Sequence, residues 1–226
     1  MSKTLLTLII AATLCNVGQA QSSFTEIFNG KDLSGWKGNP KLWSVEDGAI
    51  TGTTTADAPL KFNTFLIWEG EVADFVLELD YRIGEQGNSG IQYRSTVKDA
   101  DKFIVGGYQA DIDATMKFAG INYEEKGRGI LAQRGQRVTI DGKGKKKSEM
   151  FGDATELGSK IKKADWNRYK VIARGNKVSH YINNELMSEV IDSQKEKAAK
   201  KGILAFQIHV GPPMKIQFKN VKLKKL

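Results

Sequence analysis

Hydrophobic and polar residues alternate along many short segments of this chain, as they do in β-strands that pack on one face. The clearest case is 75–83, where Phe75, Leu77, Leu79, Tyr81 and Ile83 alternate with more polar positions. Related patterns predict strands within 24–36, 42–53, 63–68, 91–95, 103–113, 166–174, 177–182, 185–191, 202–211 and 214–223. Turn signals separate several of them, at Asn29-Gly30, Asp47-Gly48 and Asn183-Asn184. This spacing predicts an all-β fold, an antiparallel β-sandwich.

Two segments depart from the strand pattern. Residues 120–152 are rich in glycine and charge, and we expect a long excursion there with one strand near 137–140. Residues 193–201 predict the one short helix, because Ser193 and Glu196 match a capping box and Gly202 suits the stop. This helix has no apolar stripe, so we expect it on the surface.

The predicted strand at 202–211 has two very different faces. Leu204, Phe206, Ile208 and Val210 form an apolar face, whereas the other face carries Gln207 and His209. Two further strands repeat this design with Gln92 beside Arg94 and Gln109 beside Asp111. If the three polar faces align in one sheet, they form a patch that suits a sugar, since planar polar side chains bind vicinal hydroxyls. The alternative is that these residues only solvate the wet side of a sheet.

Few other residues offer catalytic chemistry. His180 shares a face with Val178 and Ile182, and we interpret it as a core histidine with satisfied hydrogen bonds. Tyr108 lies on the opposite face from Gln109, so we also expect it in the core. The two histidines rule out a three-histidine zinc site. A mixed metal site using His209, Asp111 and Glu124 or Glu125 stays open.

The N-terminus has the pattern of a secretory signal peptide at residues 1–20. Lys3 precedes the apolar run 5–14, which is too short to span a membrane, and small residues precede Gln21. We therefore expect a periplasmic or secreted protein, with residues 21–226 as one domain and no membrane association after cleavage. The only cysteine, Cys15, lies in this leader, so the exported chain has no disulfide.

The formal net charge of +8 is concentrated in a few places. Lysines cluster in the loop 143–147 and in the C-terminal segment 222–225. Such runs are compatible with nucleic-acid binding. We interpret them as a solvated loop and tail and expect no nucleic-acid partner.

Six segments, taken in order, resemble the 3-keto-disaccharide hydrolase family. They are FNGKDLSGW (28–36), WSVEDGAITGT (43–53), GNSGIQYRS (87–95), GYQADI (107–112), DWNRYKVIARGNKVSHYINNELM (165–187) and FQIHVGPPMKIQFKNVKLK (206–224). The resemblance implies a concanavalin-like jelly roll of two antiparallel sheets and a bacterial exported protein acting on glycosides oxidised at carbon 3. Ile208 stands where many relatives carry an aspartate before the histidine.

The implied reaction is cleavage of the glycosidic bond of a 3-keto-glycoside by C2 proton abstraction, elimination and hydration. It needs a base, a group that stabilises the enolate and a proton donor. Our hypothesis makes His209 the base or acid, Asp111 its partner, and Arg94 or a divalent metal ion the enolate stabiliser. Gln92, Gln109 and Gln207 would bind hydroxyls, and Glu124 and Arg128 would close over the site.

The alternative function is a non-catalytic, lectin-like carbohydrate-binding module on the same fold. Such a module would stack sugars on exposed aromatic rings, and the candidates are Trp36, Trp43, Trp68 and Trp166. An enzyme would instead gather titratable groups in a pocket. The positions of the tryptophans therefore distinguish the two functions. No cofactor other than the metal ion is expected.

Overall fold

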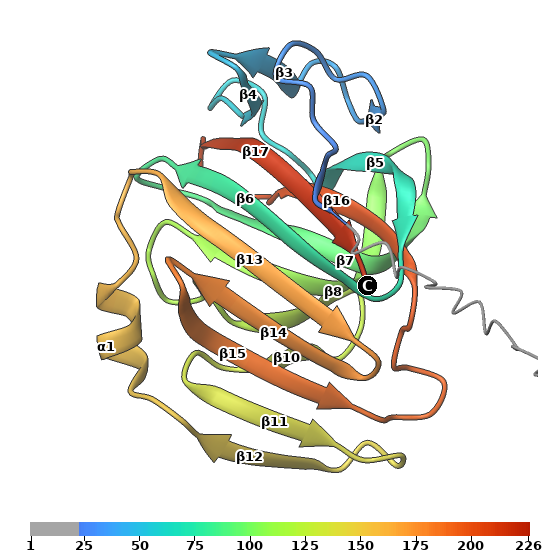
Figure 1. Ribbon diagram of the computed structural model, residues 1–226. Coiled ribbons are helices and arrows are strands. Elements are labelled where there is room, and N and C mark those ends of the chain that lie inside the picture. Colours follow the sequence, from blue (N-terminus) through green and yellow to red (C-terminus); the bar gives the residue numbers. More distant parts are fainter. Residues whose placement is uncertain (1–22) are drawn as a thin grey trace, which may run out of the picture.

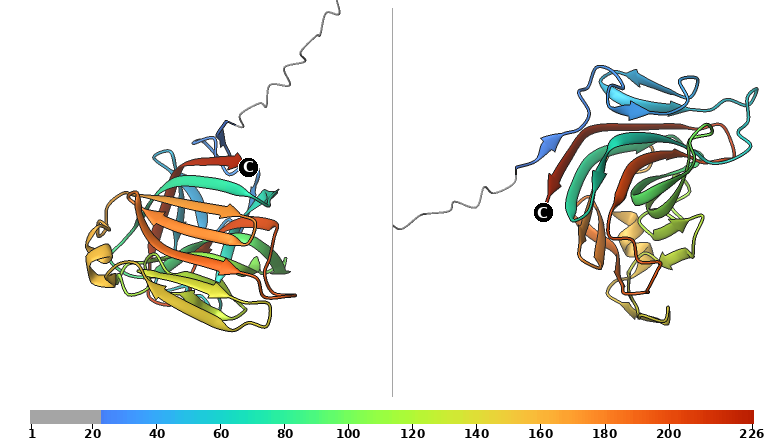
Figure 2. Two further views of the ribbon diagram at one scale, coloured as in Figure 1. Left: turned by 60° about the horizontal axis from the view of Figure 1, so that its bottom comes forward. Right: turned by 90° about the vertical axis from the view of Figure 1, so that its right-hand side faces the viewer.

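A computed structural model describes residues 23–226, so the predicted signal peptide lies outside the described residues. The fold is a sandwich of two curved β-sheets (Figure 1), and the side view shows the two layers stacked on one another (Figure 2). The prediction of an all-β sandwich is confirmed. Within residues 23–226, no helix is long and apolar enough to cross a membrane.

The larger sheet has ten strands. In spatial order they are β12 (Lys146–Met150), β11 (Gln136–Ile140), β15 (Glu185–Asp192), β14 (Lys177–Ile182), β13 (Asn167–Arg174), β6 (Phe75–Ile83), β17 (Lys215–Lys225), β4 (Ala49–Thr53) and β3 (Trp43–Glu46), and β1 (Thr25–Glu26) also pairs with β17. Their pairing is antiparallel except between β11 and β15, which run parallel. The expectation of purely antiparallel sheets is therefore wrong at this one pair.

The smaller sheet has seven strands and carries the candidate site. In spatial order they are β10 (Gly129–Ala132), β9 (Asn122–Glu125), β8 (Ile104–Asp113), β7 (Asn88–Asp99), β16 (Gly202–Ile208), β5 (Thr64–Val72) and β2 (Trp36–Lys37). The predicted excursion at 120–152 thus contains four strands. One of them, β11, confirms the strand predicted near 137–140. The others were not predicted, and β9 and β10 have only four residues each, too few for a clear alternation.

The core lies between the two sheets. Leu204, Phe206 and Ile208 of the predicted apolar face pack there, with Phe206 stacked between Phe218 of β17 at 4.0 Å and Trp36 at 4.9 Å between ring centroids. Val210 was predicted on the same face, but it lies beyond the end of β16 and is 38% exposed. The residues of 75–83 alternate between buried and half-buried positions, as predicted. The Asp47-Gly48 and Asn183-Asn184 turns are also confirmed, because all four residues have the positive φ that such tight hairpins require.

The one helix within the described residues is not where the sequence predicts it. It is α1 (Ala154–Ser159), at the side of the sandwich, and Asp153 caps it by accepting hydrogen bonds from the backbone N–H groups of Thr155 and Glu156. Residues 193–201 form turns instead. There the Ser193 hydroxyl accepts a hydrogen bond from Asn176 rather than capping a helix, and Glu196 has a φ of 67°.

Candidate active site

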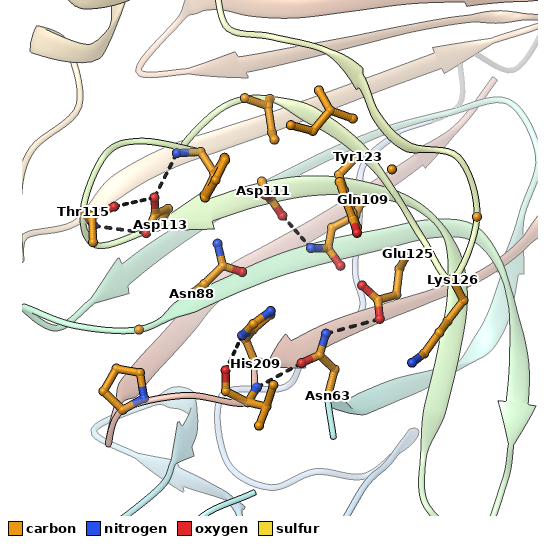
Figure 3. A pocket seen from close by; sticks show the side chains of 18 residues that line it. Asn63, Asn88, Gln109, Asp111, Asp113, Thr115, Tyr123, Glu125, Lys126 and His209 are labelled. Atoms are coloured by element: carbon orange, nitrogen blue, oxygen red, sulfur yellow. Dashed lines mark hydrogen bonds between the residues drawn. The ribbon is translucent and has the colours of Figure 1, made fainter. Parts of the chain in front are cut away.

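A cleft of about 750 Å³ opens on the face of the smaller sheet that points away from the core. Strands β7, β8 and β9 form its floor, and the segments 126–130 and 209–212 form its sides. Figure 3 shows its polar side chains pointing into one hollow: Asn63, Asn88, Gln109, Asp111, Asp113, Thr115, Tyr123, Glu125, Lys126 and His209. The apolar lining comes from Phe118, Ile121, Ile130, Val210 and Pro212.

The alternation of β8 places Gln109, Asp111 and Asp113 on this face, while Tyr108, Ala110 and Ile112 enter the core. Asp111 lies opposite Gly90 of β7. This glycine has a steric role, since a Cβ there would lie 2.5 Å from the Cδ of Gln109. The missing side chain at Gly90 therefore gives the Gln109 amide room beside Asp111.

Asp111 is the most perturbed acid of the cleft. It is 6% exposed, and its Oδ1 accepts a hydrogen bond of 2.5 Å from Gln109 Nε2. Burial raises the pKa of Asp111 to about 8, and the negative charges of Asp113 and Glu125 act in the same direction. Hydrogen bonds from Gln109 and Asn88 offset part of this rise. A carboxyl with this pKa is mostly protonated at neutral pH and can donate a proton.

His209 lines the same cleft from the residue after β16. Its Nδ1 lies 2.5 Å from the carbonyl oxygen of Val210, and a carbonyl can only accept, so Nδ1 carries the proton in the neutral ring. The neutral ring therefore has its lone pair on Nε2, which has no hydrogen-bond partner among the described residues. Two backbone N–H groups hold the segment, because His209 N donates to the backbone carbonyl of Asn88 and Val210 N donates to the side-chain Oδ1 of Asn63.

The other two acids of the cleft have local partners. Glu125 accepts a hydrogen bond of 3.2 Å from the Asn63 amide, which ties β9 to the segment that carries His209. Asp113 accepts bonds from Thr115 and from the Phe118 backbone, so it shapes the turn that leads into β9. Lys126 is the only cationic side chain among the residues that line the cleft.

Arg94 does not face the cleft, contrary to our expectation. A β-bulge interrupts β7 between Tyr93 and Thr96, and Arg94 adopts a φ of 47° within it. The extra residue turns the guanidinium away, where it donates to the carbonyls of Ala73 and Gly175 and pairs with Asp74 at 2.8 Å. Arg94 therefore ties loops together and does not reach the cleft, where an enolate would form.

Glu124 and Arg128 also lie elsewhere. Arg128 pairs with Glu124 and with Asp192 at 2.6 Å each, and it lies over the ring of Tyr108, whose hydroxyl also donates to Asp192. The prediction that Glu124 and Arg128 close over the site is wrong, because β9 points Tyr123 and Glu125 into the cleft and Glu124 to the other side.

The three predicted glutamines do come together, but only Gln109 lines the cleft. Gln92 and Gln207 are fully buried beside it: Gln109 Oε1 accepts from Gln92 Nε2 at 2.5 Å, and Gln109 Nε2 lies 3.3 Å from Gln207 Oε1. The expectation that Gln92 and Gln207 hold hydroxyls directly is therefore wrong. They support Gln109 from behind.

Two core assignments are confirmed. His180 is fully buried, its Nε2 lies 2.9 Å from the Tyr93 hydroxyl, and burial lowers its pKa to about 3. Tyr108 is buried with its hydroxyl on Asp192.

Several residues of the cleft were not predicted from the sequence. Asn88 and Asp113 each lie two steps along the alternation from Gln92 and Gln109, so extending that pattern would have found them. Asn63 and Lys126 come from segments with no recognisable pattern. Within residues 23–226, no group of three or more His, Cys, Asp or Glu side chains has the arrangement of a metal site. The divalent ion stays a prediction.

None of the four tryptophans lines the cleft. Trp36 and Trp43 are buried, and the partly exposed Trp166 lies on the other sheet under Arg82 and Lys219. A binding module was expected to stack sugars on exposed tryptophans, and an enzyme to gather titratable groups in a pocket. The arrangement of the cleft favours the second of these.

The sandwich of two curved β-sheets has the galectin-like, concanavalin-like fold. The chain belongs to the family described as the 3-keto-alpha-glucoside-1,2-lyase-like domain, which it matches over residues 23–224. A Bacteroides thetaiotaomicron protein named 3-keto-disaccharide hydrolase is 34% identical over 88 residues, which are 34% of this chain and 30% of that protein. The match thus spans less than a third of that relative.

Solved structures with the same fold include the carbohydrate-binding module CBM66 from Bacillus subtilis. Its TM-score is 0.57 at 17% identity, covering 84% of this chain and 96% of that one. A Parabacteroides distasonis protein provisionally named a glycosyl hydrolase has a TM-score of 0.57 at 22% identity, covering 90% of this chain and 94% of that one. At these identities the likeness shows the fold alone.

Proposed function

We propose that this protein cleaves the bond between C1 of a 3-keto sugar and its leaving group by elimination across C1 and C2, followed by addition of water. Family membership supports the substrate class. The observation that carries the proposal is that Asp111, held protonated by burial, shares one cleft with His209, whose Nε2 is free to accept a proton.

The reaction begins at C2, whose hydrogen the C3 ketone acidifies. His209 Nε2 takes this proton, and the electron pair of the C2–H bond forms the enolate. The enolate then restores the C3 carbonyl and forms the C1–C2 double bond as the C1–O bond breaks. Asp111 acts as the general acid: it gives its proton to the departing oxygen, which would otherwise be a poor leaving group.

Water completes the hydrolysis by the reverse sequence. The Asp111 carboxylate takes a proton from water as its oxygen attacks C1, and protonated His209 returns a proton to C2. With Arg94 outside the cleft, the donors for the enolate oxygen are the Asn88 amide and the Lys126 ammonium, which both line it. In the view of Figure 3, Asn88 lies between Asp111 and His209.

The test is turnover of a 3-keto-glycoside by the wild-type protein and two cleft variants. We expect His209→Ala and Asp111→Asn each to lower kcat by about 10²–10⁴-fold, the usual contribution of one acid or base. Asp57→Asn is the matched control, because Asp57 is exposed and outside the cleft. Wild-type protein that binds the 3-keto-glycoside without releasing its aglycone would instead support the binding-module function.

The metal requirement is tested in the same assay by dialysis against a chelator and readdition of Mg²⁺, Mn²⁺ or Zn²⁺. The proposed acid and base are both side chains of this chain, so we expect most of the activity to survive. Loss that one ion restores would make that ion the enolate stabiliser in place of Lys126.

We also propose that the reaction takes place outside the cytoplasm, after removal of residues 1–20. The N-terminal sequence of the protein recovered from its native cell fractions tests this. A mature chain that begins at Gln21 in a non-cytoplasmic fraction supports export, and an intact Met1 in the cytoplasm contradicts it.

A further inference from the structure

An unbroken run of side-chain hydrogen bonds leads from Asp111 into the smaller sheet. Gln109 Nε2 lies 2.5 Å from Asp111 Oδ1, and Gln92 Nε2 lies 2.5 Å from Gln109 Oε1. Ser95 Oγ, the next group, lies 2.7 Å from Gln92 Oε1. None of Ser95, Gln92 and Gln109 is more than 2% exposed, so water does not compete for these bonds.

The β-bulge that diverts Arg94 also creates this run. Because Arg94 is the extra residue, Ser95 takes the position beside Gln92 that Arg94 would occupy in a regular strand. Gly107 faces the bulge, and a Cβ there would lie 2.4 Å from Ser95 Oγ. The hydroxyl therefore has a fitted place at the inner end of the run, where no cleft surface reaches it.

The direction of the run depends on the charge of Asp111. An ionised carboxylate can only accept, so Gln109 must present its amide N–H to Asp111 and its carbonyl to Gln92. Gln92 then presents its carbonyl to the Ser95 hydroxyl. This is the order that the structure shows.

A protonated Asp111 permits the opposite order. Its O–H can donate to the Gln109 carbonyl, after which Gln109 donates to Gln92 and Gln92 donates to Ser95. The Ser95 hydroxyl then has the backbone carbonyl of Tyr93 as its acceptor, 3.0 Å away. Each order satisfies every link, whereas a mixture leaves two buried donors or two buried acceptors facing each other, which costs free energy.

Gln207 favours an exchange between the two orders. In the order shown, its Oε1 accepts from Gln109, and its buried Nε2 has no partner among the described residues. When Gln109 turns its carbonyl toward this side, the Gln207 amide can flip and donate to it. The reversal therefore supplies a partner for this unpaired donor.

We propose that Ser95, Gln92 and Gln109 form a proton-linked relay of positioning residues, which holds ionised Asp111 with an amide N–H and reverses as a unit when Asp111 takes up a proton. The relay links the proton at the cleft to a hydroxyl three side chains away. The relay rests on the proposed function in one respect only, namely that the proposed function gives Asp111 a catalytic role.

Other charges around Asp111 oppose the relay. Asp113 lies on the same strand and Glu125 on β9, and both favour the protonated form of Asp111. His209 and Lys126 border the cleft from the other segments. The relay donates to the ionised form, so it keeps the proton of Asp111 exchangeable near neutral pH instead of leaving the acid permanently protonated.

The experiment is an NMR titration of labelled protein between pH 5 and 10. The Asp111 carboxyl carbon reports its proton, and the side-chain amide nitrogens of Gln109 and Gln92 report the relay. We expect Gln92, which does not touch Asp111, to shift with the same midpoint as Asp111. Gln217 is the matched control: it is a buried amide of the other sheet, bonded to Arg82, and we expect it to show no transition at this midpoint.

Two variants complete the test. In Asp111→Asn the transition of Gln92 should disappear, and in Gln109→Met the Asp111 midpoint should rise by about one pH unit, a tenfold change in proton affinity. A Gln92 signal that ignores the Asp111 midpoint, or that moves equally in Asp111→Asn, overturns the relay. A coupled titration in a protein that turns over no 3-keto-glycoside leaves the relay standing and removes the proposed function.

Discussion

Removal of the Arg94 guanidinium should destabilise the fold without impairing the chemistry. The side chain is 2% exposed and holds two loops together, one through Ala73 O at 2.7 Å and Asp74 Oδ1 at 2.8 Å, the other through Gly175 O at 2.8 Å. Arg94→Met keeps the aliphatic stem and deletes all of these donors. The expected loss of stability therefore comes mainly from the missing hydrogen bonds and the missing ion pair.

The size of the loss follows from what remains behind. Deleting one partner of a buried ion pair costs about 3–5 kcal/mol. Here the side chain of Asp74 is 39% exposed, so water can replace part of the pairing. We therefore expect the free energy of unfolding to fall by about 3 kcal/mol, which corresponds to a decrease in Tm of roughly 6–12 °C for a domain of this size.

Denaturant and thermal unfolding measure the stability, and turnover per folded molecule measures the chemistry. Arg168→Met is the control: its side chain is 56% exposed with an ion pair of 3.5 Å to Asp80, so it should cost less than about 1 kcal/mol. Turnover by folded Arg94→Met should stay within about twofold of wild type, because Arg94 lies outside the cleft. Unchanged stability with a hundredfold loss of kcat would refute this assignment and return Arg94 to the reaction.

Three further variants probe the buried polar groups. Asp111 has a folded pKa of about 8, so the folded chain binds more protons than the unfolded chain between about pH 4 and 8, and stability falls as pH rises through this window. Asp111→Asn should remove this loss, which denaturation at several pH values measures; equal slopes in both proteins would contradict it. His180, with a folded pKa of about 3, has the opposite sign: stability is lost as pH falls from about 6.5 to 3, and His180→Gln should lack this acid dependence. Gly90→Ala should displace the Gln109 side chain, because its Cβ would lie 2.5 Å from Cδ, and so should shift the alkaline limb of the pH–rate profile; an unchanged profile would show that Gln109 does not need this space.

The fold was predictable because its strands obey simple alternation. Strand β6 has five apolar residues at period two, and the tight turns at Asp47-Gly48 and Asn183-Asn184 require backbone angles that these residues tolerate. The helix was misplaced because a capping box is a local signal. At Ser193 the hydroxyl has a tertiary partner, Asn176, which the local sequence does not reveal.

The candidate site was predictable only where alternation continued without interruption. Asp111 and Gln109 share a face of β8 as predicted, and His209 lies at the cleft although β16 ends at Ile208. Arg94 was assigned to the wrong face because a bulge inserts one residue into β7, and such an insertion reverses the faces beyond it. No pattern in the sequence marks where that extra residue falls.

The smaller sheet alone does not decide between an enzyme and a binding module, since solved structures of this fold include a carbohydrate-binding module. The burial of the acid on that sheet bears on the choice. A carboxyl on an open sheet face stays hydrated and ionised, so it can bind a hydroxyl but cannot donate a proton. Asp111 is 6% exposed in the cleft that segments 126–130 and 209–212 border, and its burial raises its pKa to about 8. This burial on a polar sheet face supports the role of general acid that we propose for Asp111.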